Sequence, residues 1–116
     1  MSEKKERNSV LDAVMGKAKG LAGLIEYSDD SVVSKTIIDK SVGTITLFAF
    51  DAAQGLSEHQ TPYDAFVQIV EGSGVLIIDG KEVAAKAGEI VIMPANRPHA
   101  VKAVQRFKML LTMIRA

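Results

Sequence analysis

The chain contains only two histidines, His59 and His99, and their rings are the side chains best suited to chemistry. An imidazole can bind a transition metal, exchange a proton near neutral pH, or form a directional hydrogen bond. Thr61 follows His59 by two residues, so its hydroxyl should face the same side of a strand as that ring. The absence of cysteine excludes disulfides, thiolate metal sites and thiol nucleophiles. We therefore expect any chemistry to centre on the two histidines.

The composition predicts one soluble domain. The 116 residues carry 14 Lys and Arg against 14 Asp and Glu, so the formal net charge is zero. Because nucleic-acid binding draws its affinity from clustered basic residues, a neutral chain argues against DNA or RNA as the main partner. No apolar run approaches the ~18 residues that a membrane helix needs. Charged residues also interrupt any signal-peptide pattern near the start. We therefore expect a cytoplasmic protein that binds neither nucleic acid nor membrane.

Residues 9–25 carry the only helical period in the chain. Val10, Val14, Leu21 and Ile25 recur close to one face at the 3.6-residue spacing. Three glycines interrupt this stretch, and each costs about 1 kcal/mol of helix stability relative to alanine. The helix should therefore be marginal alone and exist because it packs on something. We expect residues 1–31 to form a solvated arm and a short helix that packs on the rest of the chain or on a partner subunit.

From residue 32 onward, short runs rich in Val, Ile, Thr and Phe predict β-strands. Asp79-Gly80 lies between two such runs and predicts a two-residue hairpin turn with positive φ angles. About eight short strands at close spacing indicate an antiparallel sandwich or barrel. The expected strands are Val32–Ile38, Thr44–Phe50, Ala65–Val70, Gly74–Ile78, Glu82–Ala85, Glu89–Met93, His99–Ala103 and Phe107–Ile114.

Two of these strands have informative patterns. Both alternate rows of Thr44–Phe50 are at least partly apolar, so we expect this strand to be covered on both faces. The last strand has one wholly apolar row, which should face the interior. Methionine adapts its shape to its surroundings, so the same row could form an apolar wall for a ligand. The row consists of Phe107, Met109, Leu111 and Met113.

The spacing around the histidines resembles the two sequence motifs of the cupin family. The family's first motif runs Gly, five residues, His-x-His, three or four residues, Glu, six residues, Gly. His59 takes the place of the first histidine, and Gly72 that of the closing glycine. Thr61 stands where the second histidine would be, and Ala65 where the glutamate would be. Ala53 occupies the place of the opening glycine.

The second cupin motif runs Gly, five residues, Pro-x-Gly, two residues, His, three residues, Asn. Gly88, Pro94 and His99 match it, whereas Asn96 replaces the glycine and Ala103 the asparagine. Asparagine tolerates positive φ better than other non-glycine residues, so the turn geometry is retained. The resemblance covers residues 43–114 and implies an all-β jelly-roll barrel (a double-stranded β-helix) over residues 32–116, preceded by a short α-helix.

The resemblance also implies a possible metal. Cupins that bind metal usually present three histidines and one glutamate, and this chain keeps only His59 and His99 of those four. Transition metals favour three or four protein ligands. Asp64 lies one residue from the glutamate place, so strand alternation would turn it to the opposite face. Two interpretations stay open: a divalent transition metal (Fe, Mn, Zn or Ni) at an incomplete site, or a pocket without tightly bound metal.

The resemblance implies a ligand pocket at one mouth of the barrel, and several functions fit it. The chain could bind a small molecule, or it could be a metal-dependent enzyme of the dioxygenase, isomerase or lyase kind. It could also act as a homodimeric interaction module, with Phe48, Phe50 and the helix stripe as contact surfaces. The structural alternative is that both histidines are partly buried polar residues satisfied by backbone groups. We expect the pocket to be lined by His59, Thr61, Ala65, Val67, His99, Met109, Leu111 and Met113.

Overall fold

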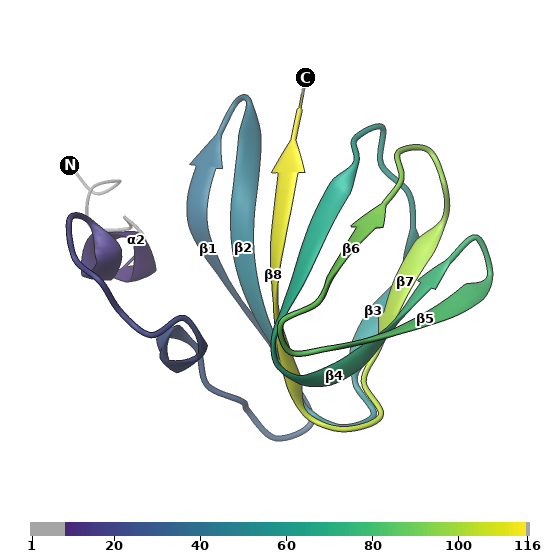
Figure 1. The fold of residues 1–116 in the computed structure, drawn as a ribbon, viewed down its shortest axis with the longest axis horizontal. Helices are drawn as coiled ribbons and strands as arrows, with labels where there is room; N and C mark the ends of the chain where they lie inside the picture. The colour runs from purple at the N-terminus through teal and green to yellow at the C-terminus, as the bar shows by residue number, and fades with distance from the viewer. Residues whose placement is uncertain (1–8, 116) are drawn as a thin grey trace.

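The computed structural model describes residues 9–115, and within them eight antiparallel strands fold into two facing sheets (Figure 1). This arrangement is the all-β jelly roll that the sequence predicts, and within residues 9–115 one short α-helix precedes the strands. No helix in this part of the chain is long and apolar enough to span a membrane. The strands are β1 (Val32–Lys40), β2 (Gly43–Phe50), β3 (Gly55–His59), β4 (Ala65–Ile78), β5 (Lys81–Lys86), β6 (Ile90–Met93), β7 (His99–Lys102) and β8 (Phe107–Ile114).

The two sheets share one long strand, β4. Its first half pairs with β6 and β8, and the first sheet runs β1-β2-β8-β4-β6. Its second half pairs with β5 and β7, and the second sheet runs β5-β4-β7-β3. The strand changes sheets near Gly72, which has φ +74° and follows a register shift between Ile69 and Glu71. A bulge and a glycine bend a strand without ending it.

The strand divisions predicted from the sequence were wrong at two places. Ala65–Val70 and Gly74–Ile78 were expected as separate strands but belong to β4. The strand Gly55–His59 was not expected, because four of its five residues are exposed and it lacks an apolar row. The predicted hairpin turn is confirmed: Ile78 pairs with Lys81, and Asp79 and Gly80 have φ angles of 54° and 81°.

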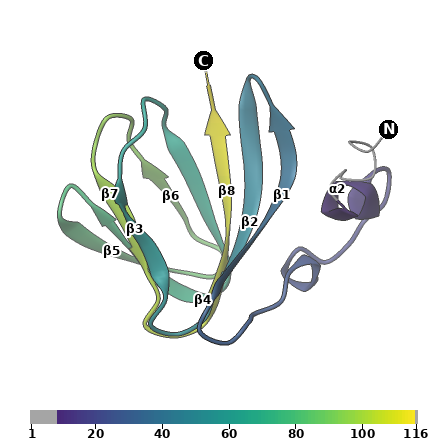
Figure 2. The same ribbon diagram turned by 180° about the vertical axis from the view of Figure 1, so that it is seen from behind.

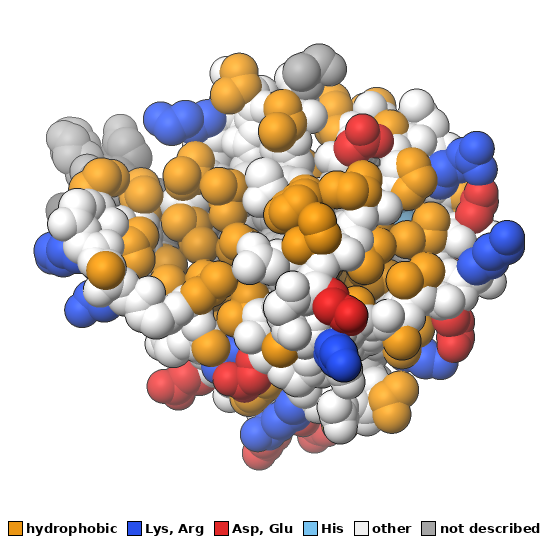
Figure 3. Space-filling view, in the orientation of Figure 1, with side chains coloured by type: hydrophobic (Ala, Val, Ile, Leu, Met, Phe, Trp, Pro, Cys, Tyr) orange, Lys and Arg blue, Asp and Glu red, His pale blue; other side chains and the backbone are white. Residues whose placement is uncertain are grey.

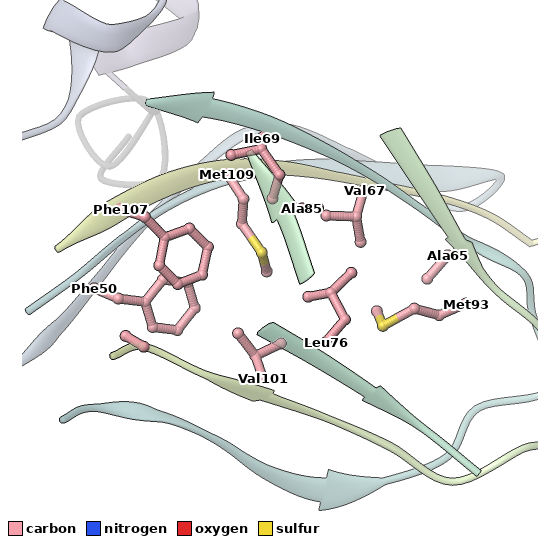
Figure 4. Packing of buried hydrophobic residues seen from close by; sticks show 11 residues of the cluster. Phe50, Ala65, Val67, Ile69, Leu76, Ala85, Met93, Val101, Phe107 and Met109 are labelled. Atoms are coloured by element: carbon pink, nitrogen blue, oxygen red, sulfur yellow. The ribbon is translucent and has the colours of Figure 1, made fainter. Parts of the chain in front are cut away.

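The core fills the space between the two sheets. Phe50 stacks on Phe107 with ring centroids 4.7 Å apart and planes 8° apart. The inward row of β8 is confirmed, because Phe107 and Met109 are fully buried while Leu111 and Met113 pack against the same cluster. Figure 4 shows the stacked rings at one end of this cluster, with Ala65 and Met93 at the other.

The N-terminal helix is shorter than the sequence predicts. Helix α2 spans Ser9–Val14, and only a 3₁₀ turn, η1 (Ala22–Leu24), follows before β1. Gly16 adopts a φ angle of +71°. A Cβ atom built on Gly16 would have no atom within 4 Å beyond the adjacent residues. No packing contact is therefore available to offset the cost of a glycine inside a longer helix. The expected arm at residues 1–8 lies outside the described residues.

Residues 21–27, here called the strap, cover part of the outer face of the first sheet. Ile25 is buried against Leu47 and Ala49 of β2, with Leu21 and Leu24 packed beside them. Strand β2 is therefore covered on both faces, as the sequence predicts. Figure 2 shows the N-terminal segment running beside β1 at the edge of the first sheet.

Polar contacts anchor the strap to the sheet. The buried ammonium of Lys108 donates to the Ala22 carbonyl at 2.7 Å and lies 4.9 Å from the centre of the Tyr27 ring. The Tyr27 hydroxyl donates to Glu71 Oε2 at 2.6 Å, and Lys108 Nζ lies 3.7 Å from the same oxygen. Burial, followed by the bond to Glu71, raises the pKa of Tyr27. These contacts satisfy a buried charge that would otherwise destabilise the fold.

We predict that Gly74→Ala destabilises the protein by about 1–3 kcal/mol, because the added methyl would overlap the Phe107 ring in a filled core. Gly20→Ala is the matched control, since nothing lies within 4 Å of a Cβ built there. Urea unfolding of both variants measures the difference. Equal midpoints and slopes for the two variants would show that the ring can move aside without cost.

Candidate functional site

The two histidines meet in the folded chain. His59 is the last residue of β3 and His99 the first of β7, and the antiparallel pairing of these strands places the two residues opposite each other. Their ring centroids are 4.4 Å apart, with planes 72° apart. Residues far apart in sequence thus form one edge-to-face pair at one end of the second sheet, here called the barrel mouth.

The two rings differ in exposure. His99 is only 3% exposed, whereas His59 lies on the outermost strand of the sheet and is exposed. Val101, two residues after His99, packs in the core cluster. Side chains two residues apart on a strand share a face, so the His99 ring also points toward the interior. His59 therefore covers the solvent side of a buried ring.

Their hydrogen bonding differs as well. His59 Nδ1 lies 2.9 Å from the Ser57 carbonyl, and because a carbonyl only accepts, Nδ1 carries the proton. In the neutral ring, His59 Nε2 then carries no proton and can accept a hydrogen bond. Neither Nδ1 nor Nε2 of His99 has a partner, although both are buried. The backbone therefore satisfies His59 but not His99, and an unpaired buried group of this kind costs about 1–3 kcal/mol.

The surroundings of His99 favour its neutral form. Burial is the main cause that lowers its pKa from the usual 6.5, and the nearby charge of His59 lowers it further. A neutral imidazole presents one N–H donor and one bare nitrogen acceptor. His99 thus offers both kinds of hydrogen bond toward the interior.

Thr61 uses its hydroxyl within its own loop. Its Oγ1 donates to the Tyr63 carbonyl at 2.9 Å and accepts from the Tyr63 N–H at 3.3 Å. The Asn96 N–H donates to the Thr61 carbonyl at 2.7 Å, and Asn96 has the expected positive φ of 63°. Asp64 Oδ1 accepts from the Ala95 N–H at 2.8 Å. The side chains of Thr61 and Asp64 therefore stabilise the two loops of the mouth, and the hydroxyl proton of Thr61 is not available to the imidazoles.

The apolar residues expected to line a pocket face the barrel interior. Ala65, Val67 and Met109 are fully buried, and Leu111 and Met113 pack against the same cluster. Met93 and Val101 belong to this cluster too, and of these two Val101 was missing from the sequence-based expectations. Alternation along β7 from His99 could have identified Val101. The role of these residues in binding a ligand stays a prediction.

Comparison with known proteins settles the family. The pattern of the cupin domain matches residues 46–114, which is more than half of the chain. The chain belongs to the cupin family. This fold supports small-molecule binding or metalloenzyme chemistry in general. Among curated proteins, no sequence matches the chain.

Solved structures agree with this assignment. A conserved protein of unknown function from Streptococcus pyogenes is 32% identical, with 86% of this chain and 88% of that one covered and a TM-score of 0.83. A cupin 2 conserved barrel protein from Leptotrichia buccalis is 38% identical over 81% of this chain, with a TM-score of 0.79, and this chain covers 46% of it, about half its length. A cupin superfamily protein from Desulfitobacterium hafniense is 27% identical, with 86% and 92% covered and a TM-score of 0.82.

Cupins often bind metals, but the side chains present here do not form a complete donor set. Among residues 9–115, no three His, Asp or Glu side chains gather closely enough to hold a metal ion. The family's glutamate position is Ala65, which has no donor atom, and the second histidine position is Thr61, whose hydroxyl bonds to Tyr63. Two imidazoles alone fall short of the three or four ligands that transition metals favour.

We predict a stability change on acidification that depends on His99. The folded-state pKa lies below the usual 6.5, so the unfolded chain takes up this proton first as the pH falls. The group has no effect on stability well above pH 6.5, and it destabilises the fold progressively below that value until the folded pKa is reached. Urea unfolding from about pH 7 to about pH 5 should therefore show a smaller loss for His99→Leu than for the unmodified protein.

The same titration can be followed in the folded protein by NMR of the imidazole protons. We expect the His99 ring to take up its proton at a pH below 6.5. A His99 ring that titrates at or above this value would show that it is charged in the fold and would remove the basis of the predicted acid sensitivity.

Proposed function

We propose that this cupin binds a small organic molecule at the barrel mouth, with the His59–His99 pair as its polar contact and without a tightly held metal. The buried His99 ring, with two unpartnered nitrogens, is the observation that supports this proposal most strongly. Buried polar groups nearly always have a partner. A ligand that supplies one would recover the free energy that the unpaired ring costs.

The chemistry of the surroundings defines the class of ligand. The buried cluster around the interior is wholly hydrophobic, so the body of the ligand should be apolar. Neutral His99 offers a donor and an acceptor, and His59 Nε2 offers an acceptor. A hydroxyl group can donate to one ring and accept from the other. We therefore infer a neutral ligand with an apolar body and one hydroxyl or similar group.

Methionine side chains provide the adaptable part of this interior. Met93 and Met109 are buried in the cluster, and Met113 packs against it. Methionine is unbranched and can change rotamer at low cost, so these side chains can make room for a ligand. Their ε-methyl groups also report on any molecule that enters.

We predict that neutral phenols shift the NMR signals of the ¹³C-labelled Met93 and Met109 methyls together with the His99 ring protons. The methyl ethers of the same phenols should bind more weakly, because they cannot donate a hydrogen bond. Met15, whose side chain is 57% exposed, is the internal control and should not shift. Shifts that are equal for phenols and ethers, or unchanged in His99→Leu, would contradict binding through this ring.

The second candidate function is metal-dependent catalysis of the dioxygenase, isomerase or lyase kind, with an unusual metal site at His59 and His99. The unpartnered nitrogens of His99 beside a bare His59 Nε2 favour it, since neutral imidazole nitrogens are common metal ligands. In such a site the metal would act as a Lewis acid or activate oxygen. The remaining ligands would have to come from solvent or substrate.

Metal analysis of the protein purified without a histidine tag separates the two functions. We predict far less than one Fe, Mn, Zn or Ni per chain, and a melting temperature that these ions do not change. Thr61→His combined with Ala65→Glu is the positive control, because it restores the family's four donors and should gain metal affinity. Near-stoichiometric metal in the unmodified protein that disappears in His99→Ala would instead establish the metal-dependent function.

A further inference from the structure

A row of side chains crosses five strands on the outer face of the first sheet. Ile45 of β2 lies between Ile38 of β1 and Thr112 of β8, and Phe66 of β4 lies between Thr112 and Ile92 of β6. The row faces outward, because the adjacent residues of β4 and β8 point into the interior. Neighbouring strands lie about 4.8 Å apart, so the row extends over about 19 Å.

This row forms the floor of two adjoining cavities, here called the outer groove. One cavity of about 580 Å³ is lined by Phe66 and Ile92, and the other, of about 390 Å³, by Ile38 and Ile45. Thr112 lines both cavities, so they meet at β8. Figure 3 shows hydrophobic side chains gathered over the middle of the molecule, where β4, β6 and β8 lie in Figure 1. The outer groove is separated from the barrel interior by the sheet itself.

The two ends of the outer groove differ in charge. Among the described residues that line the larger cavity, Asp64 of the β3–β4 loop is the only charged one. Lys40 of β1 has the same place in the lining of the smaller cavity. Isoleucines and Thr112 lie between these two ends. A cationic group therefore fits the Asp64 end and is repelled from the Lys40 end, with room for a hydrocarbon chain between them.

The Asp64 carboxylate is held in place and keeps one oxygen for a ligand. Its Oδ1 accepts from the Ala95 N–H at 2.8 Å, and no residue of the described chain bonds to its Oδ2. Tyr63 and Phe66 line the same cavity, and the faces of aromatic rings attract cations. Hydrogen bonds between a carboxylate and an ammonium are charge-assisted and stronger than neutral ones. This end of the groove thus combines the two features that recognise an organic ammonium.

The rings expected to form a homodimer contact do not contribute to this surface. Phe48 and Phe50 were expected there, but Phe50 is fully buried and Phe48 stacks on it at 5.8 Å inside the barrel. That expectation was wrong, because strand alternation turns both rings inward. Homodimer formation itself stays a prediction. The aromatic rings that the outer groove offers are those of Phe66 and Tyr63, which are half-buried.

We propose that the outer groove binds an aliphatic monoamine, with its ammonium donating to Asp64 Oδ2 and its hydrocarbon chain lying along the row toward the β1–β2 hairpin. Burial of the chain against the isoleucines supplies affinity, and the carboxylate selects the sign of the head group. Lys40 disfavours a second ammonium at the far end of the chain. This site is distinct from the histidine pair, and the inference does not depend on the proposed ligand of the barrel mouth.

NMR of ¹³C-labelled isoleucine methyls tests the proposal with octylamine as the probe. Saturable shifts should appear at Ile45 and Ile92, which lie in different cavities of the groove. Ile25, which is buried beneath the strap, should not shift, and this shows that the amine does not displace the strap. Octanoate should bind about tenfold more weakly or not at all. The diamine of the same chain length should also bind more weakly than octylamine.

Variants locate the bound amine. Asp64→Asn keeps an oxygen for the Ala95 N–H but removes the charge, and it should weaken octylamine about tenfold or more. Glu26→Gln, which removes a charge from an exposed residue outside the groove, is the matched control and should have no effect, and neither should His99→Leu.

Four results would overturn the proposal. The first is the absence of saturable shifts at the groove isoleucines. The second is octanoate or the diamine binding as tightly as octylamine. The third is equal affinity of Asp64→Asn and Glu26→Gln for octylamine. The fourth is loss of octylamine binding in His99→Leu, which would place the amine at the barrel mouth instead.

Discussion

The close approach of β4 to Phe107 is the constraint on which the rest of the structure depends. Gly72 takes a positive φ, and Gly74 leaves no room for a side chain because the Phe107 ring occupies that space. The strand can therefore bend around the ring and continue from one sheet into the other. Without this bend the two sheets would not face each other, and the space between them would not become an interior.

The histidine pair follows from this arrangement. The second half of β4 holds β7, which in turn holds β3, and their register places His99 beside Ile78 and opposite His59. The filled interior fixes the position of the buried ring, since Val101 of the same strand packs in the core. A stable core can thus hold an imidazole whose nitrogens lack partners, and that ring is the basis of the proposed binding function.

Much of this architecture could be predicted from the sequence. Residue type alone was sufficient to predict the turns at Asp79-Gly80 and at Asn96, because these residues readily adopt the positive φ angles that the structure shows. Strand alternation was sufficient to predict which side chains of β8 face the interior. The spacing of the cupin motifs was sufficient to identify the family and to select the two histidines as candidate site residues. These features depend on short-range patterns that a single sequence contains.

Other features depend on contacts between distant segments, which a single sequence does not display. The polar strand β3 exists because it pairs with β7. Strand β4 continues from one sheet into the other through the register shift after Ile69 and the positive φ of Gly72. The inward direction of Phe48 follows from its place opposite Met109 on β8. Spacing predicted that the hydroxyl of Thr61 shares a strand face with His59, but that prediction was wrong, because β3 ends at His59 and Thr61 lies in the loop that follows, where its hydroxyl bonds to Tyr63.

The central claim is that the His59–His99 pair serves an organic ligand. The most direct measurement is a high-resolution crystal structure of the protein purified from its own cells, with diffraction recorded above and below the absorption edges of Fe, Mn, Ni and Zn. We expect connected density of an organic molecule within hydrogen-bond distance of a His99 nitrogen, without an anomalous peak. A strong anomalous peak between the two rings, or a His99 ring that contacts only protein atoms, would contradict this account.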